Sequence, residues 1–207
     1  MKGTITERLL REKLVEGKLQ PGEEIGIRID QTLTQDATGT MVYLEFETLG
    51  LDSVKPDTAV SYIDHNIVQN DFKNADDHRF LQSAAARYGI ILSPPGNGVS
   101  HHVHRQRFGV PGQTLLGSDS HTTTGGCIGM LAMGAGGVEV ALAMAGKPYY
   151  INVPEVWGCY LHGKLPPWVA GKDLILQLLR EYSVKGGLGK IMEFYGPGVA
   201  DLEIADR

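Results

Sequence analysis

Two short polar motifs follow apolar segments that are typical of strands. The dipeptide Asp64-His65 comes directly after the segment 58–63. The tripeptide Asp119-Ser120-His121 comes directly after the segment 113–117. A carboxylate beside an imidazole favours the imidazolium and fixes its tautomer, so such a pair can deliver or remove a proton near neutral pH. Open α/β sheets place their ligands at the carboxyl ends of strands. The two motifs therefore indicate an acid–base site.

A third candidate is His101, in the run His101-His102-Val103-His104. Neighbouring residues of an extended chain point to opposite sides, so Asp64 and His65 meet only if the chain turns there. A pair formed by Asp119 with His101 is an equally good candidate. The plain alternative is that these are polar loop residues without a chemical role.

The remaining motifs predict neither a metal site nor a nucleotide site. His101 and His104 can share a helix face, but the helical zinc motif places two histidines four residues apart with a glutamate between them. Cys127 and Cys159 form no CxxC pair and are expected to be buried thiols. The glycines between 125 and 137 match no nucleotide motif, and they indicate either close helix packing or an anion site made of backbone amides.

Apolar spacing and cap residues predict the elements that must position these groups. Thr4 and Glu7 fit a capping box at the start of a helix that stops at Gly17. Asn74 is expected to cap a helix that runs to Tyr88. The other expected helices lie at 41–49, 99–108, 138–145 and 173–182, and the expected strands at 24–30, 58–63, 90–92, 113–117, 156–165 and 190–195.

The expected strands are short, apolar and not strictly amphipathic, which is typical of a parallel sheet covered on both faces. We therefore predict an α/β protein with three layers, α/β/α, around a mostly parallel sheet. The composition changes near 148–154. We place a boundary there, with a first α/β subdomain over 1–153 and the start of a second, incomplete one over 154–207.

The composition limits the classes of protein to which this chain can belong. The 207 residues are 42% hydrophobic and carry a net charge of −5, which is ordinary for a globular chain. No basic stripe is present, so no DNA partner is expected. The most apolar stretch, 127–146, contains Glu139 and five glycines and is not expected to span a membrane. The first ten residues are charged throughout, unlike a signal peptide, and we expect a cytoplasmic protein.

Several motifs, in order along nearly the whole chain, resemble the aconitase family. The most specific is Gly-Ser-Asp-Ser-His-Thr at 117–122. It is accompanied by Asp64-His65, by His101, and by the blocks at 35–40, 95–98, 183–187 and 196–199. The resemblance implies the fold of the aconitase iron–sulfur domain. It also implies a hydro-lyase that moves water across a carbon–carbon bond of a tricarboxylate.

The resemblance also assigns roles to residues. It implies that Asp64 and His65 help protonate the leaving hydroxyl, and that His101 and Asp119 form a second acid–base pair. The implied catalytic set is Asp64, His65, His101, Asp119 and His121, and the implied substrate contacts are Thr40, Asp119, Ser120 and His121. Thr40 stands where mitochondrial-type aconitases carry a longer glutamine.

The resemblance implies a [4Fe–4S] cluster in the complete enzyme. Its cysteines, like the substrate-binding arginines, belong to later domains, and Cys127 and Cys159 do not match them. We therefore expect the chain to act with downstream domains, in cis or in trans, and to be inactive and without a cluster alone. The blocks at 76–81 and 95–98 favour citrate over isopropylmalate or homoaconitate. A stand-alone anion-binding module and a metal-dependent hydrolase are the alternatives from other classes.

Overall fold

The computed structural model describes residues 3–207, which form two compact units. Residues 13–16 and 26–150 make up the first, here called the sheet unit. The second, here called the terminal unit, takes in the chain up to residue 12 together with residues 17–25 and 151–207. A small sheet has the order β1-β2-β8, with the strands Leu14–Glu16, Glu24–Ile27 and Tyr149–Asn152.

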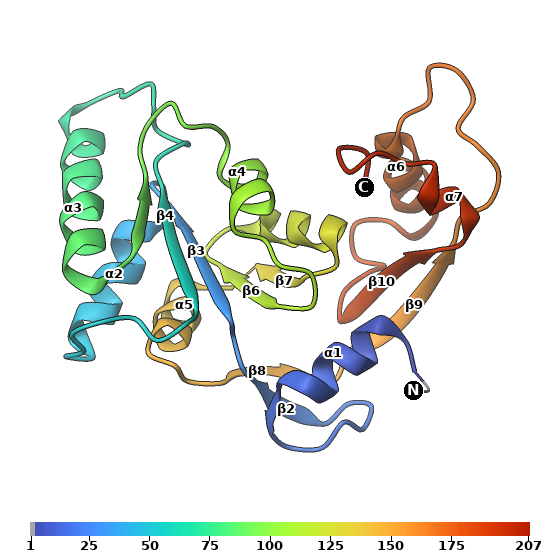
Figure 1. Ribbon diagram of the computed structural model, residues 1–207, viewed down its shortest axis with the longest axis horizontal. Helices are drawn as coiled ribbons and strands as arrows, with labels where there is room; N and C mark the ends of the chain where they lie inside the picture. The colour runs from blue at the N-terminus through green and yellow to red at the C-terminus, as the bar shows by residue number, and fades with distance from the viewer. Residues whose placement is uncertain (1–2) are drawn as a thin grey trace. The chain divides into compact units, whose positions relative to one another are not determined.

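The sheet unit is built on a five-stranded parallel sheet with the order β5-β4-β3-β6-β7 (Figure 1). From the central strand β3 the chain adds β4 and β5 on one side, then crosses over to add β6 and β7 on the other. The strand order therefore reverses between β3 and β6. The strands are β3 (Gln31–Gln35), β4 (Thr58–Tyr62), β5 (Ile91–Ser93), β6 (Thr114–Gly117) and β7 (Leu131–Gly134).

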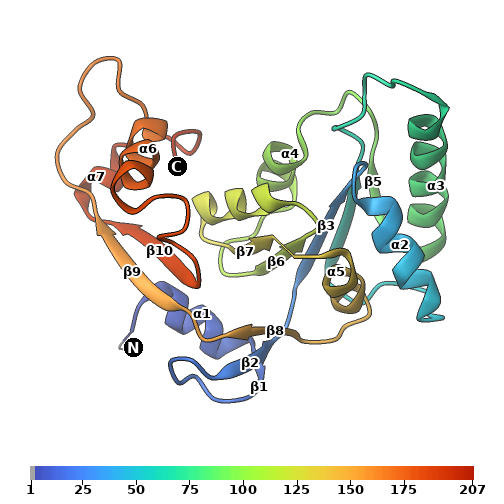
Figure 2. The same ribbon diagram turned by 180° about the vertical axis from the view of Figure 1, so that it is seen from behind.

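Helices cover both faces of this sheet, as Figures 1 and 2 show from opposite sides. On one face α2 (Gly39–Thr48) packs against α5 (Gly137–Met144), and α3 (Phe72–Tyr88) packs against α2. On the other face α4 (Ser100–Arg107) packs against the 3-10 helix η1 (Ser120–Ile128). The predicted three-layer α/β/α arrangement around a parallel sheet is thus confirmed.

The central strand β3 is buried on both faces although its sequence is Gln-Thr-Leu-Thr-Gln. On the α4 face, Leu33 packs with Val60, Tyr62 and Leu115. On the opposite face, the Thr34 hydroxyl lies 2.6 Å from the Tyr43 hydroxyl and is paired there. The single strand expected over 24–30 is therefore wrong, because β2 ends at Ile27 and a separate, polar strand follows.

Helix α3 begins earlier than the sequence predicts. Asp71 is its N-cap, and the Asp71 carboxylate accepts the Lys73 N–H at 2.8 Å. Asn74 lies inside the first turn instead, where its side-chain oxygen accepts the Asn70 N–H at 3.3 Å. The expected cap was therefore three residues too late.

The terminal unit contains α1 (Ile5–Lys13), α6 (Gly171–Tyr182) and α7 (Pro197–Ala200), with the parallel pair β9 (Glu155–Tyr160) and β10 (Lys190–Tyr195). The capping box is present, since the Glu7 N–H donates to Thr4 Oγ1 at 3.2 Å and the Thr4 N–H donates to Glu7 Oε2 at 3.0 Å. The Thr6 N–H donates to Glu193 Oε1 at 2.5 Å. This hydrogen bond joins α1 to β10, an element from the last residues of the chain. Within residues 3–207, no helix combines the length and apolar character needed to cross a membrane.

Candidate acid–base site

The loops that follow β3, β4 and β6 leave the sheet at the same edge because these strands are parallel. Gln35 pairs with Tyr62, and Leu33 pairs with Gly117, so the three strands end nearly level. This edge includes the point between β3 and β6 where the strand order reverses, which is where doubly wound sheets bind ligands. The Thr38 and Ser118 hydroxyls, from the loops after β3 and β6, lie 2.7 Å apart there.

Asp36, the first residue after β3, shapes the loop that follows β4. Its carboxylate is buried and accepts the backbone N–H groups of Asp64, His65 and Asn66 at 3.1, 2.8 and 2.9 Å. His78 Nε2 of α3 lies 2.8 Å from Asp36 Oδ2. Three successive amides directed at one carboxylate force the backbone to turn. The turn lets neighbouring side chains meet, and His65 Nδ1 lies 2.9 Å from Asp64 Oδ1.

Asp119, which follows β6, lies among three imidazoles. Its Oδ1 accepts the His121 N–H at 2.7 Å and thereby caps η1. The same oxygen is 2.8 Å from His101 Nε2 and 3.4 Å from His121 Nδ1. Asp119 Oδ2 is 3.7 Å from His65 Nε2. The two motifs found in the sequence therefore meet in one cluster, to which α4 contributes His101.

Two glycines allow the chain to fold this tightly around Asp119. A Cβ at Gly117 would lie 2.1 Å from Thr122 Oγ1, and that hydroxyl donates to the Asp119 carbonyl at 2.7 Å. A Cβ at Gly134 would lie 2.7 Å from the Asp119 carbonyl oxygen. Both contacts are shorter than a side chain tolerates, so glycine is needed here for close approach of the backbone.

The surroundings of Asp36 and Asp119 favour their ionised forms, and those of His101 favour its neutral form. Burial raises the pKa of Asp36, but the N–H groups of His65 and Asn66, with His78, outweigh it, so the pKa lies below its ordinary value. The pKa of Asp119 is lowered in the same way: burial raises it, but the His121 N–H and the nearby His101 outweigh that effect. Burial lowers the pKa of His101, which Asp119 only partly opposes.

The structure brings the five catalytic candidates together but places Thr40 differently. Ser120 Oγ lies 3.4 Å from His121 Nδ1, and the His121 ring lies 6.0 Å from that of His101. The Thr40 hydroxyl instead donates to Asp77 Oδ1 of α3 at 3.0 Å. Its role as a substrate contact stays a prediction.

Sequence reasoning assigned no role to Asp36 or to its partner His78. The available signal was an aspartate directly after a strand, the same signal that identified Asp64 and Asp119. It was missed because β3, whose residues are mostly polar, was not recognised as a strand.

Among the described residues, 3–207, two groups of three side chains have ligand atoms within 4.8 Å of one another and could hold a metal ion. The group of Asp36, Asp64 and His65 is the poorer one, because the Asp36 oxygens already face three N–H donors and His78. The better one is His101, Asp119 and His121.

An iron–sulfur cluster does not fit this chain. Such a cluster needs cysteine thiolates, usually four, or three with one open iron. The sequence contains only Cys127 and Cys159. Cys127 belongs to the sheet unit, where Arg105 Nη1 lies 3.9 Å from its sulfur. Cys159 belongs to the terminal unit, where burial raises the pKa of its thiol and disfavours the thiolate. Both thiols are half-buried rather than fully buried as expected.

The fold places this chain among the α/β proteins with a parallel sheet, and carboxylates and imidazoles gather as a candidate site where the strand order reverses. The family model described as the aconitase family (aconitate hydratase) matches residues 7–207. The chain therefore belongs to the aconitase family, as its motifs indicate.

Individual relatives agree with this placement. The chain is 38% identical over 183 residues to the mitochondrial aconitate hydratase of Saccharomyces cerevisiae, covering 84% of this chain and 23% of that protein. It is 37% identical over 216 residues to a probable mitochondrial aconitate hydratase of Caenorhabditis elegans, covering 96% of this chain and 27% of that protein. It is 34% identical over 207 residues to the 3-isopropylmalate dehydratase large subunit of Aquifex aeolicus, covering 99% of this chain and 48% of that subunit.

Two facts follow from these relatives. The chain spans about a quarter of the length of the two aconitate hydratases and about half that of the dehydratase subunit, and the matches correspond to their N-terminal part. The expected cytoplasmic location is contradicted by this comparison, because several of these relatives are named as mitochondrial proteins.

Proposed function

We propose that this chain is the N-terminal part of a hydro-lyase that interconverts citrate and isocitrate through cis-aconitate by removing and re-adding water. The observation that carries the proposal is the position of Asp119 between His101 and His65, at distances of 2.8 and 3.7 Å. The names of the aconitate hydratase relatives support a tricarboxylate substrate. The match to a 3-isopropylmalate dehydratase keeps isopropylmalate, or homoaconitate, as the second candidate.

His65 is suited to protonate a leaving hydroxyl. An ionised carboxylate only accepts hydrogen bonds, so Asp64 Oδ1 holds a proton on His65 Nδ1 at 2.9 Å. His65 Nε2 is then the nitrogen that exchanges its proton, and it faces Asp119 Oδ2 across 3.7 Å. Asp64 Oδ2 is meanwhile held by the Ser100 N–H at 2.7 Å, which fixes the orientation of the pair.

His101 and Asp119 form the second pair. The Asp119 carboxylate lies 2.8 Å from His101 Nε2 and favours a proton on that nitrogen, although the ring N–H is not aligned for a hydrogen bond, and His101 Nδ1 is left as an acceptor. Because its lowered pKa keeps His101 neutral near pH 7, this imidazole can take a proton and return it, with Asp119 stabilising the cation. Ser120 and the largely exposed His121 offer donors to substrate carboxylates beside the pair.

The remaining parts of the enzyme lie outside this chain in our proposal. The family implies a [4Fe–4S] cluster that supplies Lewis-acid chemistry to the complete enzyme, and this chain does not provide its ligands. Further domains, joined in cis or supplied in trans, would hold the cluster and complete the substrate site.

The test is citrate-to-isocitrate turnover of the full-length protein carrying Asp119→Asn or His101→Ala. Each substitution removes a positioned acid or base, so we expect turnover to fall by about 10²–10⁴-fold with little change in the thermal midpoint. His102→Ala is the matched control, because His102 is exposed on the same helix. The double variant should lose little more than the worse single variant if the two residues act together.

Two results would count against this proposal. Near-wild-type turnover in either single variant removes the catalytic assignment, and a collapsed thermal midpoint returns the residues to a structural role. Assaying the same proteins with isopropylmalate decides the substrate: faster turnover of isopropylmalate than of citrate favours the second candidate.

A separate prediction concerns the cluster. Anaerobic reconstitution of this chain alone with iron and sulfide should give no stoichiometric four-iron product, because two cysteines cannot supply three thiolates. Iron and sulfide assays, with the visible absorbance of the product, measure this. Incorporation of four irons per chain would show that the ligand set includes residues other than cysteine.

A further inference from the structure

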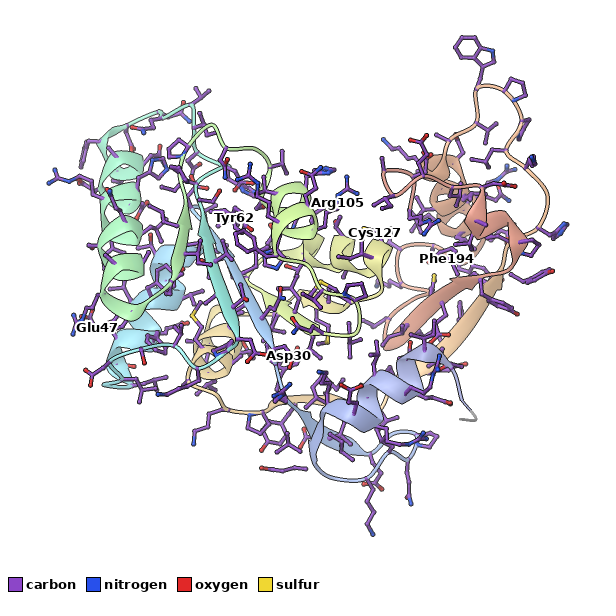
Figure 3. All side chains as sticks on the ribbon, viewed as in Figure 1. Asp30, Glu47, Tyr62, Arg105, Cys127 and Phe194 are labelled. Carbon is purple, nitrogen blue, oxygen red and sulfur yellow. The ribbon has the colours of Figure 1, made fainter. Side chains whose placement is uncertain are left out.

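His104 is a buried histidine that the proposed chemistry does not use. It projects from α4 toward the sheet and is 1% exposed. Its Nδ1 lies 3.0 Å from the Tyr62 hydroxyl of β4, and its Nε2 lies 2.8 Å from Gln31 Oε1 of β3. Figure 3 shows Tyr62 between β4 and α4, where this contact forms. One side chain therefore joins the helix to two neighbouring strands.

The partners fix the direction of each hydrogen bond. Gln31 Nε2 donates to the Phe108 carbonyl at 2.9 Å and to Gln113 Oε1 at 2.5 Å, which sets the orientation of the Gln31 amide. Gln31 Oε1 must then accept, so His104 carries its proton on Nε2. His104 Nδ1 is left with a lone pair, to which the Tyr62 hydroxyl donates. This set pairs every polar group with a neutral Nε2–H tautomer, and burial lowers the pKa of His104 to about 4.

Few other contacts decide how α4 lies on the sheet. Only Ser100, Val103 and His104 of this helix are buried. Val103 packs into the apolar cluster around Leu33, a contact without directional preference. The Ser100 N–H holds the first turn to Asp64 Oδ2. Arg105 of the same helix reaches Cys127 Sγ of η1 at 3.9 Å, a longer contact. The two hydrogen bonds of His104 are the short directional contacts that join the middle of the helix to the sheet.

His101 lies one turn before His104 on the same helix, so the rotation that His104 sets also sets the direction of the His101 ring. The contact between His101 Nε2 and Asp119 Oδ1, at 2.8 Å, leaves little tolerance. A displacement of about 1 Å in such a site can cost on the order of 10²-fold in rate. We propose that His104 is a positioning residue, whose hydrogen bonds to Tyr62 and Gln31 hold α4 so that His101 faces Asp119. This proposal rests on the proposed function of the site.

Two variants probe the contacts with different severity. Tyr62→Phe removes only the hydroxyl that donates to His104, and His104→Leu removes both hydrogen bonds while retaining an apolar side chain. His102→Leu is the matched control on the exposed side of α4. In the full-length protein we expect kcat to fall by roughly 10–10²-fold in the first two variants, with KM changed less than about threefold. The control should keep both constants.

Histidine NMR of this chain gives a measurement that is independent of turnover, because it reports the tautomer of His104 and the titration of His101. In the wild type, His104 should show the neutral Nε2–H tautomer down to pH 5. The groups that act on His101 are Asp119, Asp64 and His121. Because burial is the largest cause of its lowered pKa, loosening α4 should move the His101 titration upward, by about half a pH unit or more, in Tyr62→Phe. The control should not move it.

The outcomes separate the two proposals. An unchanged His101 titration and unchanged kcat in Tyr62→Phe and His104→Leu overturn the positioning role and leave the proposed function intact. If Tyr62→Phe moves the His101 titration upward but the wild-type full-length protein turns over neither citrate nor isopropylmalate, the positioning role is supported and the proposed function is overturned. A protonated His104 or an Nδ1–H tautomer near pH 7 also overturns the positioning role.

Discussion

Asp36 determines the shape of the loop after β4, because its carboxylate accepts the N–H groups of three successive residues. The Asp64 and His65 side chains meet because this loop turns, and the turn depends on a residue from another strand. The charge of Asp36 is stabilised by N–H dipoles and by His78, so removing it leaves several buried donors without an acceptor.

We predict that Asp36→Asn lowers the free energy of unfolding by about 3 kcal/mol, the range for breaking a buried charged contact on one side. An asparagine amide would direct its NH₂ group at donors that Asp36 Oδ2 now accepts. Urea unfolding measures the loss, and Asp52→Asn, at an exposed position, is the control. A difference below about 0.5 kcal/mol would mean that other contacts shape the loop.

The same residue predicts a dependence of stability on pH. Its pKa is lower in the folded state than the ordinary 3.8, so its stabilisation is fully present above pH 3.8 and is lost as the pH falls through the folded value. In Asp36→Asn the fall in unfolding free energy with acid should be shallower than in the wild type. Equal slopes would assign the acid sensitivity to other carboxylates, such as Asp30.

At the scale of elements, the sequence predicts helices better than it predicts the central strand. The capping box of Thr4 and Glu7 is a local signal, and both of its hydrogen bonds form. The strand β3 gives no such signal, because Gln31 and Thr34 are satisfied by residues such as Phe108 and Tyr43 that the chain brings close only after folding. The site was predicted where a strand was recognised, at Asp64 and Asp119, and the role of Asp36 was missed where it was not.

The start of α3 can be tested directly. Asp71→Ala should cost about 1 kcal/mol of unfolding free energy, because the Lys73 N–H at the helix start loses its acceptor. Asn74→Ala should cost less, since Asn74 sits inside the helix, where alanine has the higher helix propensity. Chemical denaturation of the two variants gives the ranking. A larger loss for Asn74→Ala would restore the cap that the sequence suggested.

At the scale of the whole molecule, the two units differ in how much apolar surface they bury. In the sheet unit, Leu33, Val60 and Leu116 are 0% exposed. In the part of the terminal unit after residue 150, Leu202, at 9% exposed, is the one buried hydrophobic side chain among the described residues. The helix α6 instead leaves Leu176 49% exposed, and the neighbouring elements leave further apolar side chains open to solvent: Tyr160, Val184, Leu188, Phe194 and Tyr195.

This contrast predicts how hydrogen exchange is distributed along the chain. Opening a segment costs little when few apolar contacts are lost, so amides of β10, Lys190–Tyr195, should exchange faster than those of β6, Thr114–Gly117. The strand β6 pairs with both β3 and β7, whereas β10 pairs with β9 alone, so backbone hydrogen bonding and burial both favour stronger protection of β6. Mass spectrometry of pulse-labelled chain measures it segment by segment. Equal protection of the two strands would mean that the terminal unit is stable without further cover. Faster exchange in β10 is the expected result, and it agrees with the exposed apolar side chains and the single pairing partner of this strand.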